Sequence, residues 1–117
     1  MIFQKSYIDG VIEIFPQIYK DERGFFYESY QESKSQQHGI NVKFVQDNHS
    51  FSYKNVLRGL HFQKHPHAQA KLVRVLKGKV LDVIVDTRKN SPTFGQYISF
   101  ILDDQKHTML YIAEGLA

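Results

Sequence analysis

Short runs of apolar residues, separated by polar or glycine-containing stretches, recur along the chain. In the run at 80–86, apolar side chains alternate imperfectly with Asp82 and Asp86, which is typical of a strand with one largely covered face. Many short strands at regular spacing favour a β-barrel or jelly roll. Strands are predicted at residues 11–15, 42–45, 56–62, 72–76, 80–86, 97–102 and 109–112.

One helix is predicted, at residues 28–38. This run is polar and has no wide apolar stripe, so the helix should lie at the periphery, and Gly39 is a natural C-terminal glycine. The expected fold is therefore all-β with one short peripheral helix, in one domain spanning residues 1–117. Turns are predicted at Lys77-Gly78, where glycine suits a tight hairpin, and at Ser91-Pro92-Thr93 and Asp103-Asp104.

The last predicted strand, 109–112, is followed by a few residues without a closing turn. About seven strands leave a barrel or sandwich short of partners, so an exposed edge is expected. We therefore expect the fold to be C-terminally incomplete. The chain would be the N-terminal portion of a longer domain, or another chain would supply the missing strands.

Composition excludes several classes of function. The chain has no cysteine, so it has neither disulfides nor thiolate metal sites, which is compatible with the cytoplasm. No apolar run approaches the roughly 20 residues of a membrane span. The net charge of +3 is mild and there is no basic run of the kind that tracks nucleic acid, although an anionic small molecule would be favoured.

The segment from 57 to 78 carries the most specific chemistry, with Arg58, His61 and Lys71 expected on two neighbouring strands. Two cations and a neutral base suit an acidic sugar carrier, and histidine is a good base near pH 7. His61 could equally be a core histidine bonded to backbone. Lys71 could point inward, where it would need an anion, or outward to solvent.

A metal site is not favoured. The spacing Gly59-x5-His65-x-His67-x3-Lys71-x6-Gly78 follows the first motif of metal-binding cupin barrels, but Lys71 stands where that motif has a glutamate. An ammonium group beside two imidazoles would repel a divalent cation. The two histidines are better interpreted as solvated loop residues.

Two further clusters could bind a nucleotide. The run from 21 to 28 contains Arg23, Phe26 and Glu28 and could stack a base and hold a phosphate, although a turn leading into a helix also explains it. Gln46 and Asn48 offer amide groups, in what otherwise looks like a strand-to-loop exit.

Six blocks together resemble the dTDP-4-dehydrorhamnose 3,5-epimerase family, in order and over nearly the whole chain. They are DERGFF from 21, FVQDNHS from 44, LRGLHFQ from 57, AQAKLVRVLKGKVLDVIVD from 68, SPTFGQ from 91 and YIAEGLA from 111. The resemblance implies a cupin-type jelly roll without metal or other cofactor. It also implies a homodimer with strand or loop exchange, acting on a dTDP-sugar in dTDP-L-rhamnose synthesis.

The resemblance also implies roles for individual residues. His61 matches the general base that removes the C3 and C5 protons, and Lys71 matches the cation that stabilises the enolate at the C4 oxygen. The positions that match substrate contacts are Arg23, Phe26, Glu28, Gln46, Asn48 and Arg58.

The family's tyrosine acid and the aspartate that orients its base have no counterpart here, so we expect this chain alone to be weakly active or inactive. The alternatives are a related nucleotide-sugar 3-epimerase or ketoisomerase, and a non-catalytic dTDP-sugar-binding module. A metal-dependent cupin oxygenase is a more distant alternative.

Overall fold

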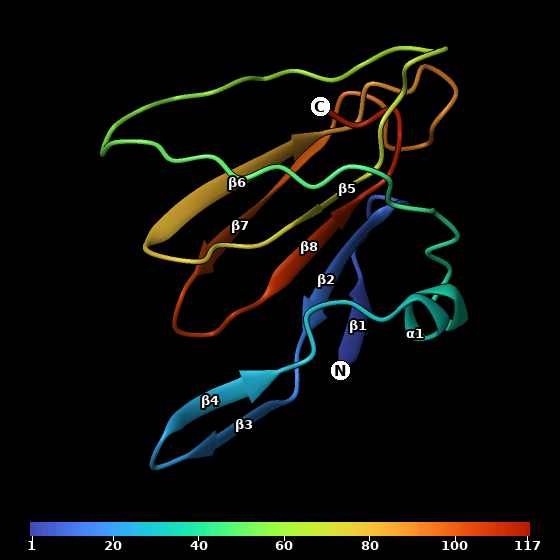
Figure 1. The fold of residues 1–117 in the computed structure, drawn as a ribbon. Helices are drawn as coiled ribbons and strands as arrows, with labels where there is room; N and C mark the ends of the chain where they lie inside the picture. Colours follow the sequence, from blue (N-terminus) through green and yellow to red (C-terminus); the bar gives the residue numbers. More distant parts are fainter.

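The computed structural model describes residues 1–117 and consists largely of strands with one short helix (Figure 1). This confirms the predicted all-β class. The elements are β1 (Ile2–Lys5), β2 (Val11–Phe15), β3 (Ile18–Asp21), β4 (Gly24–Tyr27), α1 (Glu32–Gln37), β5 (Lys71–Val73), β6 (Lys79–Val85), β7 (Tyr97–Asp103) and β8 (Met109–Ile112).

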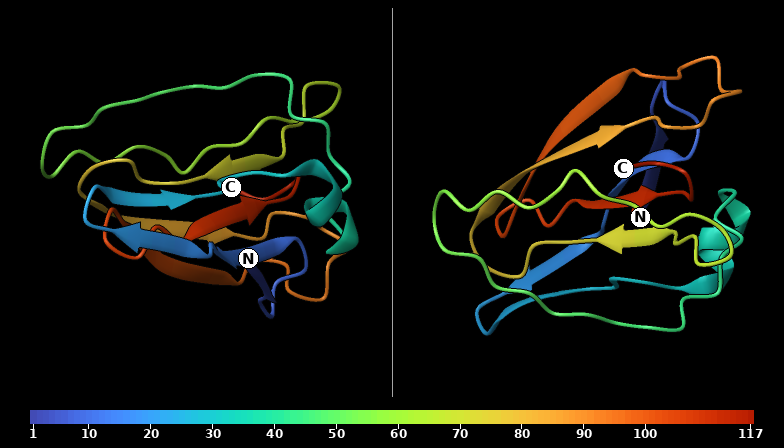
Figure 2. Two further views of the ribbon diagram at one scale, coloured as in Figure 1. Left: turned by 60° about the horizontal axis from the view of Figure 1, so that its bottom comes forward. Right: turned by 90° about the horizontal axis from the view of Figure 1, so that it is seen from above.

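The strands form three antiparallel groups (Figures 1 and 2). The largest is a four-stranded sheet in the order β1-β2-β8-β5, in which Ile112 lies opposite both Val11 and Lys71. The other two groups are the β6–β7 pair and the β3–β4 hairpin. The four-stranded sheet therefore joins segments from both ends of the chain.

Both faces of the four-stranded sheet are covered. Val11, Leu110 and Ile112 pack on one face together with Ile84 of β6 and Leu102 of β7. The opposite face carries a second cluster, formed by Ile12, Ile14, Ile40, Met109 and Tyr111. Alternation along β2 and β8 sends neighbouring side chains to opposite clusters, so β8 is apolar at every position and β2 at every position except Glu13.

The β6–β7 pair presents a mixed face to the core. Because alternate residues of a strand share a face, Asp82 lies on the same side of β6 as the buried Ile84. The other face carries Leu81 opposite Ile101, and these side chains are 66% and 59% exposed. The one acidic residue of this strand, Asp82, is thus on the core side, and apolar residues are on the open side.

Two predicted strands are absent. Residues 42–45 and 56–62 lie in a connecting segment, residues 41–70, that contains no strand or helix. It runs out from α1 and returns to β5 (Figures 1 and 2). Val45 and Leu57 are 84% and 90% exposed. The apolar residues are present, but no neighbouring strand pairs with their backbone, and a strand requires that pairing.

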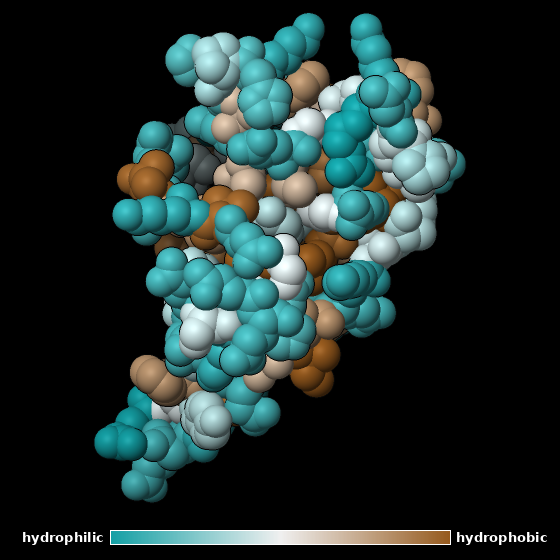
Figure 3. Space-filling view, turned by 90° about the vertical axis from the view of Figure 1, so that its right-hand side faces the viewer, coloured by the Kyte–Doolittle hydropathy of each residue, from teal (hydrophilic) through white to brown (hydrophobic).

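The helix is shorter than predicted, because it begins at Glu32 instead of residue 28. The side chain of Gln31 caps it by accepting a hydrogen bond from the Lys34 amide at 2.7 Å. The predicted stop at Gly39 agrees with the positive φ of +85° there. The face of the molecule that carries α1 is largely hydrophilic (Figure 3).

The hairpin predicted at Lys77-Gly78 is wrong, because the strands on either side pair elsewhere: β5 with β8, and β6 with β7. Gly78 instead extends the β6–β7 pair. Its amide donates to the Asp104 carboxylate at 2.8 Å, and its carbonyl accepts from the Asp104 amide at 3.1 Å. The turns predicted at Ser91–Thr93 and at Asp103-Asp104 are present.

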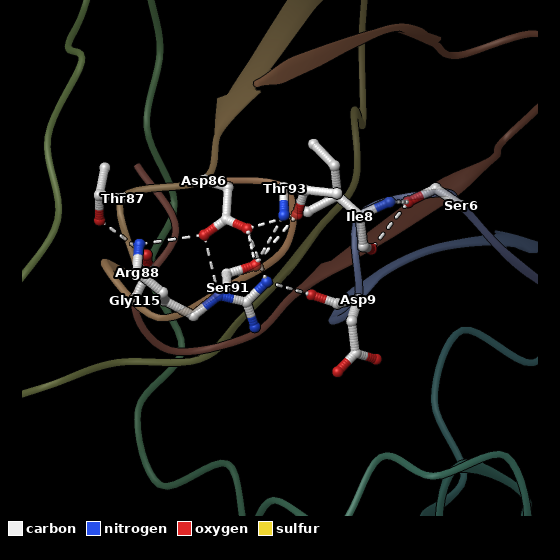
Figure 4. A network of polar contacts seen from close by, with 9 residues as sticks. All are labelled: Ser6, Ile8, Asp9, Asp86, Thr87, Arg88, Ser91, Thr93 and Gly115. Atoms are coloured by element: carbon white, nitrogen blue, oxygen red, sulfur yellow. Dashed lines mark hydrogen bonds and ion pairs between the residues drawn. The ribbon is translucent and has the colours of Figure 1, made fainter. Parts of the chain in front are cut away.

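A buried carboxylate organises the loop between β6 and β7 (Figure 4). Asp86 is 0% exposed and accepts two hydrogen bonds from the Arg88 guanidinium, at 2.9 and 3.1 Å. It also accepts from the hydroxyls of Ser91 at 2.5 Å and Thr93 at 2.6 Å. Arg88 donates further to the Asp9 carbonyl at 2.7 Å. The network therefore ties this loop to the β1–β2 turn.

Gly10 and Gly39 offer a matched test of backbone crowding, because their φ angles are +92° and +85°. A side chain at Gly10 would place its Cβ 2.6 Å from the Ala113 Cβ, whereas nothing lies within 4 Å of that position at Gly39. Gly39→Ala should cost about 1–2 kcal/mol for the left-handed backbone alone. Gly10→Ala should cost about 2–4 kcal/mol, since overpacking adds to it. Urea unfolding of the two variants measures the difference, and equal costs would contradict the assigned contact.

Candidate active site

Lys71 points into the space between the four-stranded sheet and the β6–β7 pair. It is half-buried and shares a face of β5 with Val73, which packs on the core cluster between these two layers. Asp82 reaches the same space from β6, where it shares a face with Ile84. The structure thus resolves the orientation that the sequence left open, in favour of an inward lysine.

The charges of Lys71 and Asp82 interact. Burial raises the pKa of the Asp82 carboxyl, and the positive charge of Lys71 opposes that rise. A buried lysine is costly unless an anion faces it, and Asp82 is such an anion. A cation held in this way, in a partly desolvated space, is suited to stabilising an oxyanion that forms nearby.

Asp82 is not among the site residues predicted from the sequence. The available signal was that Asp82 lies two residues before Ile84 in an otherwise apolar stretch, and alternate residues of a strand share a face. What the sequence lacked was the information that Ile84 faces the core and that Lys71 lies opposite.

The connecting segment carries four of the predicted site residues, all of them exposed. Arg58 bonds to residues six and seven positions earlier in this segment. The Arg58 Nε donates to the Ser52 hydroxyl at 2.8 Å, and the Arg58 Nη2 donates to the Phe51 carbonyl at 3.0 Å. Gln46 donates to the Asn48 side-chain oxygen at 3.1 Å. His61 lies on the returning half, outside any strand and exposed, so the buried core position considered for it is wrong.

The β3–β4 hairpin carries Arg23 and Phe26, and the third remaining residue, Glu28, follows it directly. Arg23 lies in its turn and forms an exposed ion pair with Asp21 at 2.6 Å. Phe26 is 69% exposed and lies directly opposite Tyr19, which is 61% exposed. Two aromatic side chains are thus presented side by side on one open face, and only Phe26 was among the predicted site residues.

Glu28 follows β4 and forms an ion pair of 2.7 Å with Lys34 of α1. The run from 21 to 28 is therefore a hairpin, not a turn leading directly into a helix. The predicted site residues fall into three regions: the space beside Lys71, the connecting segment and the β3–β4 hairpin.

The loop histidines do not gather other metal ligands. His65 lies 3.8 Å from the Glu114 carboxylate, with both side chains largely exposed. No three His, Asp or Glu side chains are placed to hold a metal ion. A cavity of about 360 Å³ lies elsewhere, and none of the predicted site residues lines it. Its lining includes Lys5, Asp9, Gly39 and Arg88.

Comparisons with known proteins identify the family of the chain. The protein-family model for dTDP-4-dehydrorhamnose 3,5-epimerase matches residues 5–117. The enzyme of that name from Salmonella typhimurium is 52% identical over 118 residues, which covers 100% of this chain and 64% of the relative. The one from Methanothermobacter thermautotrophicus is 49% identical, covering 98% of this chain and 62% of the relative.

Solved structures give the same result. The crystal structure of dTDP-4-dehydrorhamnose 3,5-epimerase from Bacillus anthracis, with TDP and PPi bound, matches at a TM-score of 0.95 and 42% identity. It covers 99% of this chain and 67% of that one. The Legionella pneumophila dTDP-6-deoxy-D-glucose-3,5-epimerase, in complex with dTDP-4-keto-L-rhamnose, matches at 0.93 and 48%, covering 99% and 62%. The expected cupin-type jelly-roll architecture is therefore confirmed.

No helix in the structure is long and apolar enough to cross a membrane. The chain spans between 62% and 64% of the length of the two curated relatives named above. A match of this extent and identity is decisive for kinship: the chain belongs to the dTDP-4-dehydrorhamnose 3,5-epimerase family.

Proposed function

We propose that this protein takes part in the 3,5-epimerisation of dTDP-4-dehydro-6-deoxy-glucose, without a metal or other cofactor. The observation that carries the proposal is the inward-facing Lys71, which is half-buried opposite Asp82 in a chain of this family. A fixed cation in a partly desolvated space is what a reaction through an enolate requires.

The residues suggest the following chemistry. The C3 and C5 protons of the sugar both flank the C4 ketone. The His61 imidazole takes one of them, the electron pair of the broken C–H bond forms a double bond to C4, and the π pair of the C4 carbonyl moves onto its oxygen. The Lys71 ammonium stabilises that oxyanion. A proton returned from water to the opposite face of the carbon, as the carbonyl re-forms, gives the inverted centre.

The other predicted residues would hold the substrate. Arg58, Gln46 and Asn48 present donors on the connecting segment, where a diphosphate or sugar hydroxyl could accept them. The projecting hairpin brings Arg23 and the exposed Phe26 to a different place in the molecule. In a homodimer, such a hairpin could reach the nucleotide of the partner's site. A cytoplasmic location, where the nucleotide sugar is available, completes the proposal.

Solvent exchange tests this function directly. In D2O with dTDP-4-dehydro-6-deoxy-glucose, we expect deuterium at both C3 and C5 by NMR, at the low rate expected of a chain without a matched tyrosine acid, and we expect His61→Asn to reduce both rates further. Label at one carbon would indicate a single-site epimerase in place of the proposed enzyme. Binding without label would leave a dTDP-sugar-binding module, and a chain that neither binds nor exchanges would refute the proposal.

A further inference from the structure

The β3–β4 hairpin has two different faces. It projects beyond the sheets as a separate pair of strands (Figures 1 and 2). Tyr19 and Phe26 lie opposite each other on the open face. By alternation, Phe25 and Tyr27 lie on the other face, with their rings stacked at a centroid distance of 6.1 Å. A two-stranded hairpin is at best marginally stable alone, so its direction must be fixed by contacts with the rest of the molecule.

His107 supplies such contacts. It lies in the turn between β7 and β8 and is only 8% exposed. Its ring centroid is 4.7 Å from that of Phe25 and 5.0 Å from that of Tyr27. One imidazole from the main body thus packs against both aromatic rings on the inner face of the hairpin.

The turn that carries His107 is itself held in place. The Asp103 carboxylate accepts hydrogen bonds from the amides of Gln105 at 3.0 Å and Lys106 at 2.8 Å. His107 then adopts a φ of +57°, which is uncommon for a residue other than glycine. This left-handed conformation directs a buried ring from a capped turn toward the hairpin.

We propose that His107 is a positioning residue. It fixes the direction of the β3–β4 hairpin so that Arg23, Tyr19 and Phe26 are presented together to a nucleoside diphosphate. This inference rests on the proposed function, because it takes dTDP as the occupant of the open face. His107 does not touch the ligand. It acts through Phe25 and Tyr27, and its loss would let the hairpin sample directions in which the three groups do not meet the ligand.

The test measures dTDP affinity by calorimetry on the purified chain. His107→Asn keeps a residue that tolerates positive φ but removes the ring. We expect it to weaken dTDP binding about tenfold, equivalent to about 1.4 kcal/mol. The matched control is His38→Asn, which removes another stacked histidine, 4.1 Å from Phe3 in centroid distance. The control should bind dTDP like the wild type.

Rescue separates positioning from general stability. His107→Phe restores a ring at the same place, and we expect it to recover most of the affinity. The inference is overturned if His107→Asn binds like the wild type, or if His107→Phe is as weak as His107→Asn. If His107→Asn does not fold, the affinity of His107→Phe decides: binding near that of the wild type supports the inference, and a tenfold loss overturns it.

A second readout is independent of the proposed function. If the wild type does not bind dTDP, the proposed function fails and the nucleotide part of the inference fails with it. Amide hydrogen exchange in β3 and β4 still reports whether His107 fixes the hairpin. Faster exchange in His107→Asn than in His38→Asn supports that role, and equal exchange overturns it.

Discussion

Asp86→Ala is expected to lower the free energy of unfolding by about 3 kcal/mol, because it leaves the partly buried Arg88 guanidinium without its counter-ion. The hydroxyls of Ser91 and Thr93 lose their acceptor at the same time. For a domain of this size, the midpoint of thermal unfolding should fall by roughly 10–15 °C. Calorimetry measures both quantities.

The chain provides a matched control for this prediction. Asp21 and Arg23 have the same spacing as Asp86 and Arg88, but their side chains are 49% and 87% exposed. Exposed ion pairs contribute little, so Asp21→Ala should leave the unfolding midpoint close to that of the wild type. Similar losses in the two variants would contradict the importance of burial at Asp86.

The same network predicts a pH dependence. Hydrogen bonds from Arg88, Ser91 and Thr93 hold the pKa of Asp86 well below its usual range. A carboxyl whose pKa is lowered by folding contributes its full stabilisation above its unfolded pKa of about 3.9 and loses it as the pH falls further. Asp86→Asn should therefore flatten the decline in stability below about pH 4. If Asp86→Asn lost stability below pH 4 as steeply as the wild type, other carboxylates would be responsible for the decline.

Lys71→Met is expected to slow deuterium exchange at C3 and C5 by about 10²–10³-fold, the usual effect of removing one group that stabilises an oxyanion. Methionine keeps much of the volume of the lysine stem, so the packing beside Val73 should survive. Asp82 loses the cation that opposes the rise of its pKa. It is therefore expected to be protonated more readily, which limits the cost of the change to folding.

The control for this variant is Lys79→Met, which removes an exposed lysine at the start of β6. With this variant, deuterium should enter C3 and C5 of the sugar at the wild-type rate. If Lys71→Met retained full exchange with an unchanged unfolding midpoint, Lys71 would have no part in the chemistry. If it unfolded, Lys71→Arg would keep the cation and test the same role.

The sequence predicted those strands that are apolar and bounded by turn residues, as β2, β6, β7 and β8 show. It failed where a strand depends on a partner that local pattern does not reveal. Residues 42–45 and 56–62 have suitable side chains but no neighbouring backbone, whereas the polar β3 forms because it pairs with β4 across a two-residue turn.

The site was predictable to a similar extent. Lys71 could be named from residue type and family resemblance, but its direction depended on which face of β5 meets the core. Asp82 required knowledge of the opposite layer. The contact of His107 with Phe25 joins the β7–β8 connection to a strand that is distant in sequence, and no local pattern encodes it.

The pairing of β2 with β8 also constrains how the protein can fold. This ladder joins residues 11–14 to residues 109–112, so nearly the entire chain must be closed into a loop before its first bond forms. Contacts of such long sequence separation slow folding, because the entropy of loop closure is lost before any contact compensates for it. During synthesis, β2 can pair with β1, but its other edge has no partner until β8 leaves the ribosome. The β1–β2 hairpin would in that interval be the segment most in need of a chaperone.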